Sequence, residues 1–162
     1  MNAGLSDKRS NSTESLPKMV DISGKAVVRR EAVAEGTIKL KKATLRLMRQ
    51  GKIEKGDPIQ IATIGAIQAV KSTSRLLMMC HPIPIESVSV DLFKAKDSIT
   101  VRAKVTASSK TGVEMEALNA VANALLNIWD VVKKYEKDSN GQYPETKISD
   151  IRVVRKLKEV PN

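Results

Sequence analysis

Two runs of alternating apolar and polar residues lie close together in the middle of the chain, and they restrict the possible folds more than any other feature. The runs cover residues 83–93 and 99–105, and only the short charged link 94–98 separates them. Alternation with a period of two is typical of half-buried strands, so the two runs predict a β-hairpin. From Gly112 to about Lys137 the apolar residues recur with a period of 3.6 instead, which predicts a long amphipathic helix.

The remaining segments complete an order of strands and helices. Residues 26–40 predict an extended first segment, and residues 41–50 predict a short helix. A second helix, which we expect to be mostly buried, follows over 59–73 after the N-capping residue Asp57. Alternation over 148–157 predicts a last strand. The order β-α-α-β-β-α-β predicts an α+β fold, in which a ferredoxin-like antiparallel sheet has its helices packed on one face.

The length of 162 residues predicts a single compact domain. Residues 1–18 are polar and contain few apolar side chains, so we expect a disordered N-terminal tail. The domain is then predicted to cover 19–157, with 158–162 as a C-terminal tail. The sequence has no apolar run of membrane-spanning length, no secretory signal and only one cysteine, which favours a cytoplasmic protein with no membrane partner.

The charge balance favours a phosphate-bearing partner. Lys and Arg number 28 against 18 Asp and Glu, which gives a formal charge of +10. This charge attracts phosphates, whether they belong to a nucleic acid or to a nucleotide-like small molecule. Aromatic residues make up 2% of the chain, too few for the stacking surfaces of a single-strand binder. An enzyme is therefore favoured, and a non-catalytic basic nucleic-acid-binding module or a scaffold oligomer remains the alternative.

A polar stripe is predicted along the helix that follows Gly112. Its members recur in steps of three and four residues: Glu116, Asn119, Asn123, Asn127 and Asp130. Asparagine is a poor helix former, so three of them on one stripe indicate a hydrogen-bonding demand. An ordinary exposed face and a polar seam against another subunit are the alternatives. Asp130 with Lys133 has the spacing of a common surface ion pair, and in a cleft the same pair would serve as acid and base.

Further candidate residues lie in short motifs at loops and helix ends. The segment 111–118 places the carboxylates of Glu114 and Glu116 at a predicted helix start, where they favour proton-transfer chemistry. His81 lies between Cys80 and a proline in a loop, and loops of this kind often carry function. A structural histidine and a small buried thiol are the alternative interpretations.

Three cations are candidates for binding phosphate. Lys55 precedes a glycine at a helix start, where backbone N–H groups are exposed. Lys71 lies near the far end of the same predicted helix, and Arg30 on the first strand has a guanidinium suited to bidentate contacts. The glycine spacing of a Walker A loop is absent, which disfavours ATP hydrolysis.

Several motifs in the same order resemble the family of molybdenum cofactor biosynthesis protein C, the cyclic pyranopterin monophosphate synthases. The resemblance covers about residues 19–154. The segments that carry it are Met19-Val20-Asp21-Ile22, Arg30-Glu31-Ala32, Lys55-Gly56-Asp57, Lys71-Ser72-Thr73, Cys80-His81-Pro82, Thr111-Gly112-Val113-Glu114-Met115-Glu116-Ala117-Leu118 and Trp129-Asp130-Val131-Val132-Lys133.

The resemblance implies a phosphorus-oxygen lyase that acts without a metal or an organic cofactor. Its substrate would be (8S)-3',8-cyclo-7,8-dihydroguanosine 5'-triphosphate, and its products cyclic pyranopterin monophosphate and pyrophosphate. The resemblance also implies a homohexamer, a trimer of dimers, with each active site at a dimer interface. It implies no nucleic-acid partner.

The resemblance also assigns site residues. Asp130 is implied as the catalytic acid/base, together with Lys133 and with Lys55, and whether Lys55 comes from the same or from the neighbouring subunit is left open. The residues implied to bind substrate are Met79, Cys80, His81, Met115, Glu116, Glu114, Lys71 and Arg30. This chain departs from the family pattern at Ser72, in a longer loop over 138–146, and in lacking a glycine-rich C-terminal tail with a lysine. Whether Lys156 replaces that lysine is left open.

Overall fold

The computed structural model describes residues 16–159 of the chain, so most of the predicted N-terminal tail lies outside the described residues, as do 160–162 of the C-terminal tail. Three helices and four strands follow one another in the predicted order. They are β1 (Val28–Lys39), α1 (Lys42–Arg49), α2 (Pro58–Leu76), β2 (Ser87–Lys94), β3 (Ser98–Ser109), α3 (Glu114–Glu136) and β4 (Lys147–Glu159).

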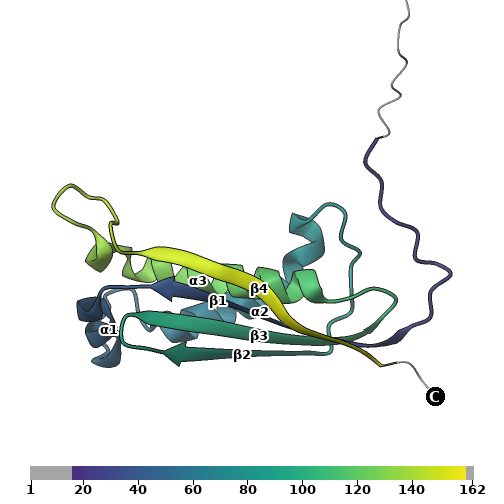
Figure 1. The fold of residues 1–162 in the computed structure, drawn as a ribbon, viewed down its shortest axis with the longest axis horizontal. Helices are drawn as coiled ribbons and strands as arrows, with labels where there is room; N and C mark the ends of the chain where they lie inside the picture. Colours follow the sequence, from purple (N-terminus) through teal and green to yellow (C-terminus); the bar gives the residue numbers. More distant parts are fainter. Residues whose placement is uncertain (1–15, 160–162) are drawn as a thin grey trace, which may run out of the picture.

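The four strands form one antiparallel sheet in the spatial order β2-β3-β1-β4. In Figure 1 the two long helices α2 and α3 lie behind this sheet, while α1 lies at one end beside the β2–β3 turn. The turn is joined to the chain before α1 by a hydrogen bond in which the Leu40 N–H donates to the carbonyl of Asp97. The predicted ferredoxin-like α+β fold, with its long helices on one face, is thus confirmed.

The core lies between α3 and the central strand β1. The side chains of β1 that face the helices are small near its middle, at Ala32 and Ala34, and both are fully buried. Gly36 continues this line, and a Cβ atom there would lie only 2.9 Å from side-chain carbons of Ile151 and Val121. The small residues let α3 approach the sheet closely, so β1 provides the surface on which α3 is positioned.

Helix α2 begins as predicted but is less buried than predicted. The Asp57 carboxylate accepts a hydrogen bond of 2.8 Å from the Ile59 N–H, and Pro58 occupies the first turn. Only one face of the helix is buried, and Ile64 on the opposite face is 68% exposed. The expectation of a mostly buried helix was therefore wrong, because α2 packs on α3 and on the edge strand β2, and within residues 16–159 no element covers its outer face.

Strand β2 starts later than the apolar alternation predicts. The alternation begins at residue 83, but the strand begins at Ser87. Pro82 and Pro84 flank Ile83, and a proline has no N–H to donate to a neighbouring strand. The segment between α2 and β2 therefore remains a loop, and it carries Cys80 and His81.

The polar stripe of α3 faces α2 of the same chain. Asn119 Nδ2 donates to the backbone carbonyl of Ala69 at 2.9 Å and to Thr73 Oγ1 at 3.1 Å. Asn123 and Asn127 are hydrogen-bonded to each other, and a Cβ on Gly65 of α2 would lie 2.6 Å from Asn127 Nδ2. The two predicted alternatives for the asparagines, an exposed face and a seam with another subunit, were therefore wrong. The asparagines lie in a seam between α3 and α2 of the same subunit. Of the stripe only Asp130 remains exposed.

Strand β4 pairs with β1 through two register shifts and continues to Glu159. Asp150 adopts a positive φ of 58° beside one of the shifts. The shifts leave Val153 opposite the buried Ala34. Among residues 16–159 no helix combines the length and the apolar character needed to span a bilayer.

Candidate active site

Asp130 lies in the last third of α3 between two lysine ammonium groups. Lys133, one turn further along the helix, donates from Nζ to Asp130 Oδ1 at 2.7 Å. Lys55, from the segment between α1 and α2, donates from Nζ to Asp130 Oδ2 at 2.8 Å and to the Asp130 backbone carbonyl at 3.1 Å. The structure thus brings the three residues predicted as catalytic together within one subunit, so Lys55 reaches Asp130 of its own chain and not that of a neighbour. Each of the three side chains remains about half exposed to solvent.

The contacts with lysine change the proton affinity of this cluster. Hydrogen bonds from Lys133 and Lys55 lower the pKa of Asp130 from its ordinary value of 3.8 to about 2. The hydrogen bond between Lys133 and Asp130 in turn raises the pKa of Lys133. At neutral pH an ionised carboxylate therefore lies between ammonium groups. These contacts move the pKa values of Asp130 and Lys133 away from neutral pH, so the cluster holds Asp130 as the candidate proton acceptor and the ammonium groups as the candidate donors.

The position of Lys55 depends on contacts that the sequence did not reveal. The preceding residue Glu54 donates its backbone N–H to Tyr135 Oη at 3.0 Å, and its carboxylate forms an ion pair with Lys134. The side chain of Ile53, which directly precedes Glu54, is buried and also anchors this segment. Two residues of α3 therefore hold the segment from which Lys55 reaches Asp130.

A second group of predicted residues surrounds the first turn of α3 and the loop before β2. They line a pocket of about 280 Å³. Its lining comprises Met79, Cys80, His81, Ile83, Thr111, Gly112, Glu114, Met115 and Glu116.

Burial controls two titrating groups in this pocket. Burial, together with the charge of Glu116, raises the pKa of the Cys80 thiol, so the structure favours an unreactive thiol over a nucleophile. Glu116 is only 3% exposed, and burial raises its pKa, with a further contribution from the charge of Glu114. A carboxyl group with a raised pKa keeps its proton to a higher pH than an ordinary glutamate does, which suits it to donating or exchanging a proton.

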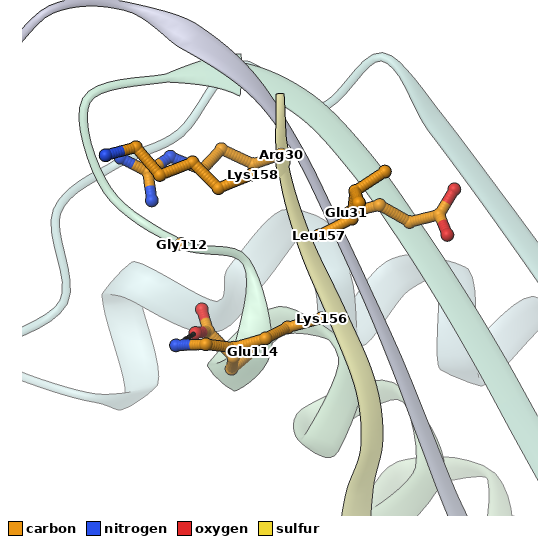
Figure 2. A pocket seen from close by; sticks show the side chains of 7 residues that line it. All are labelled: Arg30, Glu31, Gly112, Glu114, Lys156, Leu157 and Lys158. Carbon is orange, nitrogen blue, oxygen red and sulfur yellow. Dashed lines mark hydrogen bonds and ion pairs between the residues drawn. The ribbon is translucent and has the colours of Figure 1, made fainter. Parts of the chain in front are cut away.

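A third recess of about 270 Å³ adjoins this pocket, and the two have Gly112 and Glu114 in common. Figure 2 shows that residues of β1 and β4 form its other wall. Arg30 is oriented by its donation to the backbone carbonyls of Ser109 and Lys110, at 3.4 and 3.3 Å. Lys156 donates to Glu114 Oε1 at 3.0 Å.

The ion pair with Lys156 affects the charge state of Glu114. Burial favours the neutral acid, but the hydrogen bond from Lys156 and the charges of Lys156 and Arg30 outweigh it, so the pKa of Glu114 is lowered. The Lys156 side chain therefore belongs to the recess, beside the predicted substrate-binding residues Glu114 and Arg30. Glu114 enters any reaction there as a carboxylate held by a lysine.

The predicted residues fall into two groups within one subunit. Lys71 lines a groove that has Ile83 in common with the His81 pocket, so it belongs with the second group. Fourteen residues of α3 separate Glu116 from Asp130, which at 1.5 Å per residue is about 20 Å along the helix axis. The reacting atoms of one small molecule cannot contact both ends of this length. The two groups of candidate residues are therefore too far apart within one subunit to act on the same atoms.

Comparison with known proteins decides the family. A model of the MoaC family matches residues 19–158. The relative from Sulfolobus acidocaldarius, named "Probable cyclic pyranopterin monophosphate synthase", is 56% identical over 140 residues, which cover 86% of this chain and 98% of the relative. Relatives with the same name from Saccharolobus solfataricus and Pyrococcus furiosus are 56% and 52% identical over 142 residues, covering 88% of this chain and 95% and 91% of the relatives. This chain belongs to the MoaC family.

The buried carboxylate of Glu116 gives this MoaC-family chain a predictable pH dependence of stability. Because its pKa is raised above 4.5 on folding, the folded protein binds this proton more tightly than the unfolded chain does. The free energy of unfolding therefore decreases as the pH rises from 4.5 through the raised pKa that Glu116 has in the folded protein. We expect Glu116→Gln, which resembles the protonated form, to increase the urea midpoint relative to the unsubstituted chain at pH 7, with a smaller difference at pH 4.

The exposed Glu145 provides the control, because Glu145→Gln changes the same functional group at the surface. This control should show no pH-dependent difference in the urea midpoint. An equal effect of Glu116→Gln at both pH values would contradict the assignment of a raised pKa to Glu116.

Proposed function

We propose that this chain is a cyclic pyranopterin monophosphate synthase whose proton transfers take place at Asp130. The substrate is the cyclised dihydroguanosine triphosphate, and the products are cyclic pyranopterin monophosphate and pyrophosphate. Membership of the MoaC family and the names of its close relatives support this lyase activity. The observation that supports the site is the Asp130 carboxylate, hydrogen-bonded by both Lys133 and Lys55.

The proposed roles follow from the charge and position of each group. Asp130 accepts a proton from the substrate, and Lys133 and Lys55 stabilise the charge that develops and return a proton. Arg30 and Lys71 bind the phosphates, which carry the negative charge that departs as pyrophosphate. Met79, Cys80, His81, Met115, Glu116 and Glu114 surround the ring system. The proposed chemistry uses side chains only, without a metal or an organic cofactor.

We further propose that two subunits complete each active site. One subunit supplies the Asp130 cluster and its partner supplies the His81 and Arg30 pockets, since the two groups lie about 20 Å apart along α3. A two-fold dimer would place two such composite sites at one interface. The proposed assembly is a homohexamer built as a trimer of these dimers and located in the cytoplasm. The domain that forms it was predicted to end at 157, but it includes β4 as far as Glu159. We propose no nucleic-acid or membrane partner.

The composite site is tested by mixing two inactive variants. Asp130→Asn and His81→Ala are each expected to lack activity when produced alone. The two variants are co-expressed with different tags, and hexamers that carry both tags are purified. With random pairing, half of their dimers are mixed, and each mixed dimer has one intact site out of two. Random pairing then gives about a quarter of the activity of the unsubstituted chain, measured as pterin fluorescence after oxidation of the product. Mixed dimers without activity would mean that one subunit holds the whole site, and the proposal of two contributing subunits would fail.

A further inference from the structure

The end of β4 places a lysine in the recess that contains Arg30. Lys158 is the register partner of Arg30 across the β1–β4 pair, and both residues line the recess with Lys156 and Glu114. Figure 2 shows the two side chains extending in the same direction from neighbouring strands, toward the turn that contains Gly112. The sequence had assigned Lys158 to a tail beyond the domain, so its place in this wall is a finding of the structure.

The carboxylates of the recess are engaged by other residues. Glu114 is hydrogen-bonded by Lys156, and Glu31 forms an ion pair with Arg155 at 3.1 Å. Within residues 16–159 neither Arg30 nor Lys158 forms an ion pair with a carboxylate. The Arg30 guanidinium is nevertheless fixed in place by two backbone carbonyls. The recess therefore presents two cations to solvent, one of them with a fixed orientation.

Two like charges on directly opposed residues of antiparallel strands repel each other. A second such pair, Lys39 opposite Lys147, lies at the other end of the same two strands, so repulsion alone does not identify a ligand site. The Arg30–Lys158 pair differs because it lines a recess of about 270 Å³, next to the pocket that contains His81. An anion that accepts hydrogen bonds from both side chains would convert this repulsion into binding energy.

We infer that Lys158, together with Arg30, binds phosphate oxygens of the triphosphate substrate and of the pyrophosphate that leaves. This inference rests on the proposed function and adds a binding residue to it. A guanidinium offers paired donors and an ammonium offers three, and together they suit a ligand with several adjacent anionic oxygens. Pyrophosphate has this character, whereas a single carboxylate has only two oxygens for the two cations.

The test compares binding of pyrophosphate to the full chain by isothermal titration calorimetry. Lys158→Gln is expected to weaken binding about tenfold, the effect of losing one charge-assisted hydrogen bond, and Lys158→Arg should retain most of the affinity. Lys147→Gln is the matched control, because it removes a lysine from the same strand and from the same kind of like-charge pair. This control is expected to leave the affinity for pyrophosphate unchanged.

Activity and thermal unfolding separate binding from folding. Lys158→Gln should raise KM for the triphosphate substrate about tenfold with little change in kcat, and its Tm should follow that of Lys147→Gln. If Lys158→Gln binds pyrophosphate as tightly as the unsubstituted chain, the inference is overturned while the proposed function stands. Equal weakening by Lys147→Gln would also overturn it, since only net charge would then matter. Pyrophosphate binding that depends on Lys158 in a chain without lyase activity would support the anion site and refute the proposed function.

Discussion

Replacing Asp130 with asparagine is expected to lower kcat by about 10²- to 10⁴-fold, the range associated with losing a general acid or base. Asparagine has nearly the same shape as aspartate, but its single oxygen can accept a hydrogen bond from only one of Lys133 and Lys55, and it cannot take up a proton. The substitution also leaves two ammonium groups without their counter-ion. Single-turnover measurement of pterin formation would show the loss directly.

The fold should survive this substitution, because about half of the Asp130 side chain is exposed and exposed ion pairs contribute little to stability. Asp91→Asn is a suitable control, since Asp91 is an exposed aspartate on β2, away from the Asp130 cluster. Circular dichroism and the elution volume of both variants should match those of the unsubstituted chain. If Asp130→Asn turned over within about tenfold of normal, the carboxylate would not be the proton-transfer group that we propose.

Local signals in the sequence were sufficient for the order of the elements. The change of period from two to 3.6 near Gly112 separates β3 from α3, and the Asp57-Pro58 pair marks the start of α2. These features depend on neighbours in the chain, so a single sequence contains them. The depth of α2 and the partner of the asparagine stripe depend on how α2 packs on α3, which local periodicity cannot specify.

The candidate site was predictable to a similar extent. Asp130 and Lys133 are three residues apart on one helix, so their contact follows from the helix repeat. The contact of Lys55 with Asp130 joins positions 75 residues apart and depends on the hydrogen bond between Glu54 and Tyr135. Lys158 was missed because it lies opposite Arg30 only after two register shifts in the β1–β4 pairing. In the structure Asp150 has a positive φ beside one of these shifts, but nothing in the polar sequence around it predicts the shift.

The largest expected effect on stability comes from Glu136, a fully buried carboxylate at the end of α3. Both of its oxygens accept hydrogen bonds from the Lys41 N–H, at 3.2 and 3.1 Å, and one also accepts from the Thr146 hydroxyl. Lys41 is the N-cap residue of α1 and Thr146 directly precedes β4, so a single side chain joins three elements. A carboxylate beside the N-terminus of α1 also interacts favourably with that helix's dipole.

Glu136→Ala is expected to reduce the free energy of unfolding by about 3–5 kcal/mol, because it leaves the partly buried Lys41 N–H and the buried Thr146 hydroxyl without acceptors and opens a cavity. Urea unfolding at fixed protein concentration measures this loss, since the proposed assembly would make the midpoint depend on concentration. The exposed Glu145, next to Thr146, serves as control, and Glu145→Ala should change stability by less than about 0.5 kcal/mol. A loss below about 1 kcal/mol for Glu136→Ala would show that water replaces the carboxylate, and that α1, α3 and β4 are held together by apolar packing alone.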